Sequence, residues 1–355
     1  MRVLYILRSG RLSRLRDDGQ PFPDEMFYGY LQLRARPGWS VELRERRTTS
    51  ALLLKVQELG HWVTHLFPEV GDASELTADL RARFDAILST SEPTLLMLAL
   101  RPGGARLVQV LMGWEKRLAR SRFPSLTRRV MRWLGERLSA VVVLGEGERD
   151  FLVREQLVPA ARVHVIQFGV DAAFWTPGAG GPGEAALAVG NDDGRDYDTL
   201  LAAIGNRPLR LHTSLEVRAA LPANVTRTRG GWSNRELSDA GLRDLYRRAR
   251  MVVVPLTDSS QPQGQSVTLQ AMACGRPVIL TRTRGLWSPA LMRHQENCWL
   301  VPPRDPAALR EAIERLWTDE ALAAHIGQAA AATAGQHFTS ARMADDLGAL
   351  LARVG

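Results

Sequence analysis

Apolar and polar positions follow a repeating order along this chain: a short run rich in β-branched residues, then a longer stretch with apolar residues at helical spacing. This order predicts βαβ units, in which crossover helices join parallel strands. Residues 141–144 are apolar throughout, as expected for a strand that helices cover on both faces. In the first half of the chain, strands are expected at residues 3–7, 41–45, 84–88, 107–111, 140–144 and 163–167.

A glycine-rich segment separates this series from a second one. Residues 178–183 contain four glycines and one proline, a composition typical of a linker. Strands of the second series are expected at residues 185–189, 209–213, 251–255, 277–281 and 299–301. The expected fold is therefore α/β with two doubly wound domains. Their expected limits are residues 1–175 for the first domain, 176–184 for the linker, 185–338 for the second domain, and 339–355 for a C-terminal helix that can cross back to the first domain.

The composition is that of an ordinary globular protein, with 45% hydrophobic and 24% charged residues. The two cysteines, Cys274 and Cys298, lie in apolar or structured stretches, so neither a disulfide framework nor a cysteine-ligated metal site is expected. No apolar run is long enough for a membrane span or the core of a signal peptide. A cytoplasmic protein is therefore expected, with peripheral attachment at the inner face of the membrane as an extension of that expectation.

The net charge of +8 is concentrated in one segment, because residues 116–137 contain eight basic residues and a single acid, Glu136. One interpretation is an amphipathic helix over residues 125–138 that packs on its sheet and leaves its arginines in water. Another is an acceptor-side surface for an anionic membrane or a phosphorylated acceptor. Nucleic-acid binding is not expected, because the segment lacks interleaved exposed aromatic residues.

The window with the most chemistry is residues 261–279, which predicts a loop, a helix and a strand in immediate succession. The loop is polar and contains Gly264, and Ser266 stands at the expected start of the helix. The backbone N–H groups of Gln265, Ser266 and Val267 would then have no partner within the helix, which makes a site for an anion such as a diphosphate. The alternative is an ordinary capped helix of an α/β domain.

Four segments of the chain, in order, resemble motifs of the retaining family 4 glycosyltransferases (glycosyl transferases group 1). They are residues 168–177 (FGVDAAFWTP), 245–255 (LYRRARMVVVP), 269–279 (LQAMACGRPVI) and 295–309 (QENCWLVPPRDPAAL). The resemblance implies a GT-B architecture, two Rossmann-like domains with the active site in the cleft between them. It also implies a nucleoside diphosphate sugar as donor, with the amides around Gly264 to Val267 at the diphosphate and Gln270 at the nucleotide ribose.

The chain departs from the family pattern at several of these places. The family usually carries two glutamates where this chain has Pro262 and Gln270, which leaves Gln263 and Gln265 as neutral groups toward the donor sugar. Gln270 can still bind a ribose hydroxyl through its amide.

After the strand expected at residues 185–189, the family commonly has an arginine and a lysine. Here Asn191 stands at the arginine position and Arg195 near the lysine position. Arg195 is the best candidate for a phosphate partner, since a guanidinium matches phosphate oxygens. The alternative is a surface ion pair of Arg195 with Asp193 or Asp198.

Three further features complete the candidate list. Asp196 and Asp198 match a DxD metal motif, but their place at a helix start favours capping, so no metal and no cofactor are expected. Glu115 lies after an expected strand, on the acceptor side of this fold, and is a candidate catalytic acid or a surface residue. Gly10 follows the first strand and is counted with the donor-binding residues; as the single glycine there it does not make a dinucleotide-binding GxGxxG motif.

The expected function is metal-independent transfer of a hexose-type sugar, with retention, from a nucleoside diphosphate sugar to an unknown acceptor, which could be a saccharide, a lipid-linked molecule or a small molecule. In retaining members the leaving diphosphate is itself stabilised, a task that Arg195 and the helix-start amides can perform. Two alternatives remain open. One is a nucleotide-sugar 2-epimerase. The other is a non-catalytic homologue that serves as a scaffold or partner subunit, which is suggested by the absence of the family's two glutamates.

Overall fold

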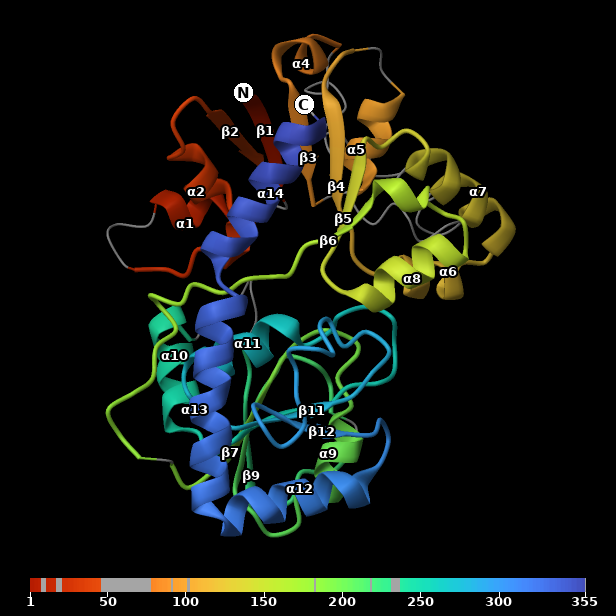
Figure 1. Ribbon diagram of the computed structural model, residues 1–355. Coiled ribbons are helices and arrows are strands. Elements are labelled where there is room, and N and C mark those ends of the chain that lie inside the picture. Colours follow the sequence, from red (N-terminus) through yellow and green to blue (C-terminus); the bar gives the residue numbers. More distant parts are fainter. Residues whose placement is uncertain are drawn as a thin grey trace. The chain divides into compact units, whose positions relative to one another are not determined.

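The chain folds into two compact units, seen in the computed structural model (Figure 1). Unit 1 comprises Met1–Gly19, Met26–Gln167 and Met343–Gly355, and unit 2 comprises Gln20–Glu25 and Phe168–Arg342. The structure describes residues 1–7, 11–16, 21–45, 78–90, 92–100, 103–181, 183–217, 219–230 and 237–354.

Unit 1 is built on a six-stranded parallel sheet with strand order β2-β1-β3-β4-β5-β6. The strands are β1 (Arg2–Leu7), β2 (Ser40–Glu45), β3 (Ala86–Ser89), β4 (Arg106–Val110), β5 (Ala140–Val143) and β6 (Val163–Val165). The α-helices of this part of the chain are α1 (Leu12–Arg16), α2 (Tyr30–Arg34), α4 (Ala78–Arg83), α5 (Glu92–Ala99), α6 (Trp114–Arg120), α7 (Pro124–Gly135) and α8 (Glu146–Arg154). Short 3-10 turns lie at Glu25–Phe27 and Ala160–Arg162.

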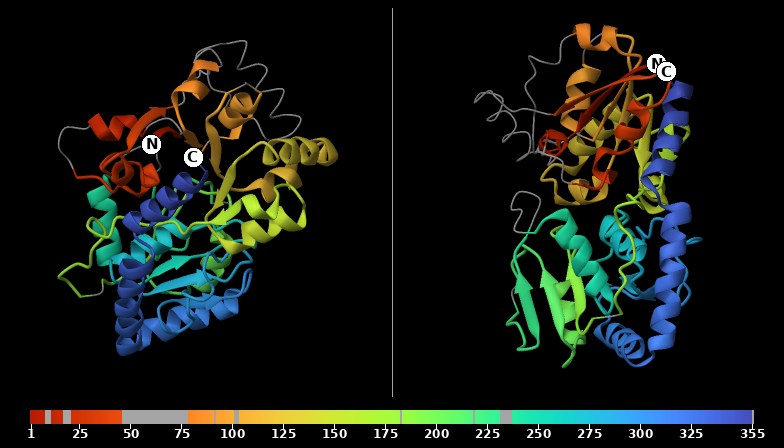
Figure 2. Two further views of the ribbon diagram at one scale, coloured as in Figure 1. Left: turned by 45° about the horizontal axis from the view of Figure 1, so that its top comes forward. Right: turned by 90° about the vertical axis from the view of Figure 1, so that its left-hand side faces the viewer.

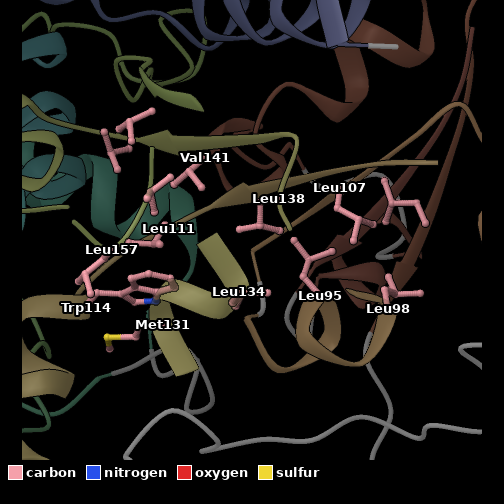
Figure 3. Packing of buried hydrophobic residues seen from close by; sticks show 14 of the residues in the cluster. Leu95, Leu98, Leu107, Leu111, Trp114, Met131, Leu134, Leu138, Val141 and Leu157 are labelled. Atoms are coloured by element: carbon pink, nitrogen blue, oxygen red, sulfur yellow. The ribbon is translucent and has the colours of Figure 1, made fainter. Parts of the chain in front are cut away.

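The core of unit 1 shows how α6 and α7 are held against the sheet (Figure 3). Trp114 and Met131 are fully buried beside Leu111 and Leu134. The buried face of α7 is Thr127, Met131 and Leu134, whose spacing is that of one helix face. Leu126 is an apolar residue of the same helix but does not belong to this face, because it is 46% exposed.

Unit 2 is built on a second six-stranded parallel sheet with strand order β12-β11-β10-β7-β8-β9. The strands are β7 (Ala186–Val189), β8 (Leu209–His212), β9 (Val225–Thr228), β10 (Val252–Val254), β11 (Val278–Thr281) and β12 (Trp299–Val301). The helices are α9 (Tyr197–Ala203), α10 (Asp239–Arg248), α11 (Gln265–Ala273), α12 (Pro306–Thr318) and α13 (Glu320–His337). The expectation of a doubly wound parallel fold is confirmed for both units. Sequence patterning missed β9, a short strand at the sheet edge with alternating exposure.

Helix α13 packs against the end of α11, as Figures 1 and 2 show. A Cβ on Gly327 of α13 would lie 2.5 Å from the carbonyl oxygen of Gly275, so the two backbones approach closely. Helix α14 (Ser340–Val354) follows, and its residues from Met343 onward group with unit 1. No helix in the described part of the chain is both long enough and apolar enough to cross a membrane.

The division between the units falls between Gln167 and Phe168, before the glycine-rich segment 176–184. That segment lies within unit 2 and is partly packed, because a Cβ on Gly183 would lie 1.8 Å from the carbonyl oxygen of Arg248. A stretch from near the N-terminus, Gln20–Glu25, also groups with unit 2.

The order of strands places a topological switch point in unit 2 between β7 and β10. From β7 the chain proceeds outward through β8 to β9, and then returns to the opposite side of β7 to form β10. In open parallel sheets, ligands bind at such a point, outside the carboxyl ends of the strands. The segments that follow β7 and β10 are therefore the places to look for a site.

Candidate functional site

Arg195 and the start of helix α11 lie together at the switch point of unit 2. Arg195 follows β7, and its backbone pairs with Leu256, which follows β10. The flanking hydrogen bonds run from Asp196 N to Pro255 O (3.1 Å) and from Thr257 N to Gly194 O (2.9 Å). This pairing places the Arg195 side chain beside the loop that leads into α11.

Two glycines make room for the guanidinium of Arg195. A Cβ on Gly190, at the end of β7, would lie 2.2 Å from Nε of Arg195, and one on Gly264 would lie 3.2 Å from its Nη1. Both glycines also have positive φ, of 149° and 69°, which L side chains rarely adopt. Arg195 is thus enclosed between the end of β7 and the first residue of the α11 turn.

The charge of Arg195 is only partly balanced within the described chain. Its side chain is 2% exposed, and Nε lies 2.9 Å from Oδ2 of Asp192, an ion pair without hydrogen-bond geometry. The alternative of a pair with Asp193 or Asp198 is thus replaced by a pair with Asp192. Nη1 of Arg195 is buried and has no hydrogen-bond acceptor among the described residues. A buried cation with an unused donor is suited to an incoming anion.

Helix α11 begins without a side-chain cap, unlike its neighbours in unit 2. Its N-cap is Gly264, and the helix starts at Gln265, one residue before the expected start. Helices α9, α10, α12 and α13 each have an N-cap side chain that accepts a backbone hydrogen bond, from Asp196, Ser238, Asp305 and Asp319 respectively. The capping role expected of the pair Asp196 and Asp198 is confirmed for Asp196, whose side chain accepts from Thr199 N. Helix α11 therefore has no side-chain acceptor at its N-cap of the kind that these other helices have.

The remaining predicted residues of this loop lie around Arg195. Gln263 packs over Gly194, and its Oε1 atom is buried and accepts no hydrogen bond from the described residues. Gln265 and Val267 are buried, whereas Ser266 is partly exposed. The predicted cluster of Gly264, Gln265, Ser266 and Val267 is therefore brought together with Arg195 and Gln263 in one place.

Asn191 has a structural role in the observed arrangement. Its Nδ2 donates to Gly230 O (2.7 Å), and its Oδ1 accepts from Ser214 N (2.6 Å) and Thr213 Oγ1 (3.2 Å). These bonds tie the end of β7 to the segments after β8 and β9. The donor-binding role expected for Asn191 stays a prediction. Its amide already makes the three hydrogen bonds above, so a donor would have to share it with them.

Gln270 belongs to a buried network that patterning did not reveal. Its Nε2 donates to Oε1 of Glu25 (2.9 Å), and its Oε1 accepts from Tyr246 Oη (3.1 Å). The Nε1 of Trp175 also donates to Oε1 of Glu25 (2.8 Å), and the backbone N–H of Asp171 donates to Oε2 (3.1 Å). Burial raises the pKa of the Glu25 carboxyl to about 7, although the hydrogen bonds from Gln270 and Trp175 act to lower it. Glu25 lies in no motif, and no local pattern could have identified it.

The segment 168–177 supplies two members of this network, and its fold explains its composition. Val170 pairs with the turn between α13 and α14, through Val170 N to Phe338 O (2.8 Å) and Ser340 N to Val170 O (3.0 Å). A Cβ on Gly169 would lie 2.0 Å from the carbonyl oxygen of Thr339, so glycine is required there. Oδ1 of Asp171 accepts from the backbone N–H groups of the following turn, which aims Trp175 at Glu25.

Two other candidates, Glu115 and Gly10, remain. Glu115 lies in the first turn of α6 in unit 1, partly buried. Gly10 lies outside the described residues. Among the residues that the structure describes, no group of three or more histidine, cysteine, aspartate or glutamate side chains could hold a metal ion.

Most of the chain matches two family models of glycosyltransferases. Residues 188–319, which contain the Arg195 and α11 cluster, match the family model described as glycosyl transferases group 1. Residues 35–174 match the model described as glycosyltransferase family 4. The chain belongs to these glycosyltransferases. The resemblance drawn from the four sequence segments is thereby confirmed.

Relatives of this glycosyltransferase share part of its length. The D-inositol 3-phosphate glycosyltransferase of Frankia alni is 29% identical, over 52% of this chain and 52% of that protein. A protein of the same description from Streptomyces bingchenggensis is 34% identical over 35% of this chain and 25% of its own length. The chain thus spans about half or less of the curated relatives that it matches.

Solved structures resemble this glycosyltransferase over its whole length. Sucrose-phosphate synthase from Thermosynechococcus elongatus has a TM-score of 0.74 at 19% identity, covering 100% of this chain and 99% of that one. Anabaena HepE in complex with UDP has a TM-score of 0.68 at 17% identity, covering 99% of this chain and 100% of that one. At such identities the likeness shows the fold, which is the two-domain GT-B fold.

Proposed function

We propose that this glycosyltransferase takes a sugar from a nucleoside diphosphate sugar and transfers it to an acceptor with retention of configuration and without a metal ion. The observation that carries the proposal is the buried Nη1 of Arg195, which has no acceptor among the described residues and faces the uncapped start of α11. A cation and a helix N-terminus aimed at one place favour a group with two or more negative charges.

In the proposed mechanism, the diphosphate of the donor lies between Arg195 and the N–H groups of Gln265, Ser266 and Val267. When the bond between the anomeric carbon and the diphosphate oxygen breaks, negative charge develops on that oxygen. The guanidinium and the helix-start amides stabilise this charge, since they are already oriented before the reaction. The leaving diphosphate then accepts the proton of the attacking acceptor hydroxyl, so that no basic side chain is required.

Two other groups fit this arrangement. Asp192, whose side chain is 38% exposed, can turn into bulk water when a phosphate replaces it as the partner of Arg195. The buried Oε1 of Gln263 offers an acceptor to a hydroxyl group of the donor sugar. HepE was solved with UDP, with UDP-glucose, and with UDP and glucose, which supports a nucleotide sugar as the ligand class for this fold.

The proposal is tested by calorimetric titration with UDP, GDP and ADP sugars in the presence of EDTA. At least one nucleoside diphosphate sugar should bind saturably, and the matching nucleoside diphosphate should compete while the free nucleoside should not. Hydrolysis of the bound donor, followed by NMR at the anomeric centre, then checks retention. Saturable binding without any turnover would favour the non-catalytic alternative, and no binding to any donor would refute the proposal.

For the acceptor, we propose contact with an anionic membrane through the basic segment 116–137 of unit 1. At the corner between α6 and α7, Phe123 (49% exposed) and Leu126 (46% exposed) lie in the same segment as the exposed Arg120, Arg122 and Arg129. Apolar side chains beside arginines suit the boundary between acyl chains and anionic headgroups, where each basic residue contributes about 1 kcal/mol.

Flotation with vesicles of anionic and of zwitterionic lipid tests this contact. The protein should float with the anionic vesicles at low salt, and the double variant Phe123→Ser, Leu126→Ser should float less. A matched control is Arg310→Ser, an exposed change in unit 2. Equal flotation with both kinds of vesicle, or with neither, would contradict the proposal.

A further inference from the structure

Glu25 is a buried carboxylate that the proposed mechanism does not use. It is 1% exposed, and in the described part of the chain its charge is met by hydrogen bonds and by no cation. Three neutral donors hold it instead: the Gln270 amide, the Trp175 indole and the Asp171 backbone. Removing an unpaired carboxylate from water is unfavourable, so a buried one held by converging donors marks a place where the charge has a use.

The network of Glu25 reaches the face of α11 that belongs to the donor site. Gln270 and Ser266 are four residues apart on α11 and therefore share one face of the helix. Gln270 directs Nε2 to Glu25 and Oε1 to the hydroxyl of Tyr246. The second hydrogen on Nε2 has no acceptor among the residues described by the structure.

The residue types at positions 25 and 270 depend on each other. Nε2 of Gln270 lies 2.9 Å from Oε1 of Glu25, so a carboxylate at position 270 would place two negative charges in contact. An amide at both positions would remove the charge altogether. One acid and one amide satisfy the network, and this chain has the acid on the Gln20–Glu25 stretch and the amide on α11.

We propose that Glu25 is a positioning residue of the donor site: it supplies the carboxylate that position 270 lacks and fixes the Gln270 amide for a ribose hydroxyl of the nucleotide. In its ionised form Glu25 only accepts hydrogen bonds, so it holds Nε2 of Gln270 toward itself and leaves Oε1 for Tyr246. The remaining N–H of the amide is then held in one direction, available to a hydroxyl oxygen. The part of this inference that concerns the ribose rests on the proposed function. The dependence between the residue types at positions 25 and 270 does not rest on it.

The first experiment measures thermal unfolding of four proteins: the wild type, Glu25→Gln, Gln270→Glu, and the exchanged double variant E25Q/Q270E. Each single variant should have a lower Tm than the wild type, and the double variant should recover most of the sum of the two losses. Glu311→Gln, an exposed acid of α12 in unit 2, serves as the control and should not change Tm. If the decrease in Tm of the double variant equalled the sum of the two single decreases, positions 25 and 270 would not depend on each other, whatever the protein binds.

The second experiment measures the Kd of the best nucleoside diphosphate sugar for the same proteins. Glu25→Gln should raise Kd about tenfold, as expected for loss of one charge-assisted hydrogen bond, and the double variant should return it to within about threefold of the wild type. The nucleoside diphosphate should show the same changes, whereas inorganic pyrophosphate, which has no ribose, should bind all four proteins alike. Equal changes for pyrophosphate would overturn the positioning role.

A separate variant keeps the inference testable if Glu25→Gln does not fold. Trp175→Phe removes one donor to Glu25 and keeps an aromatic ring beside Tyr246. It should raise the Kd of the nucleotide about threefold and leave that of pyrophosphate unchanged. An unchanged nucleotide Kd in a folded Trp175→Phe protein would count against the inference. If the wild type binds no nucleotide sugar, the proposed function fails, and the unfolding experiment still decides whether the charge has been exchanged.

Discussion

Helix α6 of unit 1 and helix α11 of unit 2 begin alike. Each has a glycine N-cap in the left-handed conformation, Gly113 with φ of 84° and Gly264 with φ of 69°, and neither has a side-chain cap. In unit 1 the backbone N–H of Gly113 donates to the carboxylate of Glu148, which is 1% exposed. In unit 2 the side chain that meets the helix start is the guanidinium of Arg195.

The difference shows that two helix N-termini of the same backbone conformation can have different uses. One is already bound to a side chain of the protein, and the other can bind a ligand. A carboxylate of the protein already supplies the negative charge at the start of α6, so that start needs no ligand. A cation at the start of α11 instead adds to the positive end of the helix, an arrangement that becomes favourable when an external anion binds. The two helix starts therefore differ in the charge of the neighbouring side chain, and the glycine N-cap is common to both.

The largest effect should come from removing the cation of unit 2. Arg195→Met keeps much of the buried side-chain volume and deletes the guanidinium, so the Kd for a nucleoside diphosphate should rise about 100-fold, close to 3 kcal/mol. Calorimetry measures the affinity, and circular dichroism at rising temperature checks that the variant is folded.

Arg207→Met is the matched control for this change. Arg207 is an arginine of unit 2 whose side chain is 33% exposed, and it pairs with Glu314 of α12 at 2.6 Å. Its loss should lower stability slightly and leave the nucleotide Kd unchanged. Equal losses of affinity in both variants would show that Arg195 acts on stability alone.

A smaller effect on affinity should come from the glycines themselves. Gly264→Ala introduces a Cβ that would lie 2.7 Å from Cγ1 of Val254 and 3.2 Å from Nη1 of Arg195, so the guanidinium must shift. The nucleotide Kd should rise about tenfold, with about 1 to 2 kcal/mol of backbone strain in addition. Gly113→Ala should introduce the same backbone strain in unit 1 but should not change the nucleotide Kd. A rise in Kd for Gly113→Ala of the same size would remove the distinction between the two helix starts.

The sequence shows some parts of this site and hides others, for reasons of distance along the chain. The strands other than β9 and the start of α11 are local patterns, and these were predicted to within a few residues. Arg195 was singled out because it stands near the position of the family's lysine after β7, and its phosphate-binding role stays a prediction. Glu25 could not be found, since its contact with Gln270 joins positions 245 residues apart.

Two smaller misses have physical causes as well. Strand β9 (Val225–Thr228) has only four residues at a sheet edge, too few for alternation to stand out. The buried face of α7 does not follow from hydrophobicity, because the apolar Leu126 is exposed, whereas the polar Thr127 is fully buried and shares a hydrogen bond with Ser121. Hydrophobicity alone does not register a buried hydroxyl that has a partner.

The smallest effect on nucleotide affinity should come from the carboxylate of unit 1. Glu148→Gln keeps an oxygen that can accept from Gly113 N–H and removes the negative charge at the start of α6, so the free energy of unfolding should fall by about 1 kcal/mol. The nucleotide Kd should stay within about twofold of the wild type, because the α6 start has no part in donor binding. Denaturant unfolding and calorimetry on the same preparation measure both quantities, with Glu146→Gln in the same helix as control. If Glu148→Gln instead weakened nucleotide binding as strongly as Arg195→Met, the α6 start would belong to the donor site, and the contrast between a satisfied and an available helix start would no longer hold.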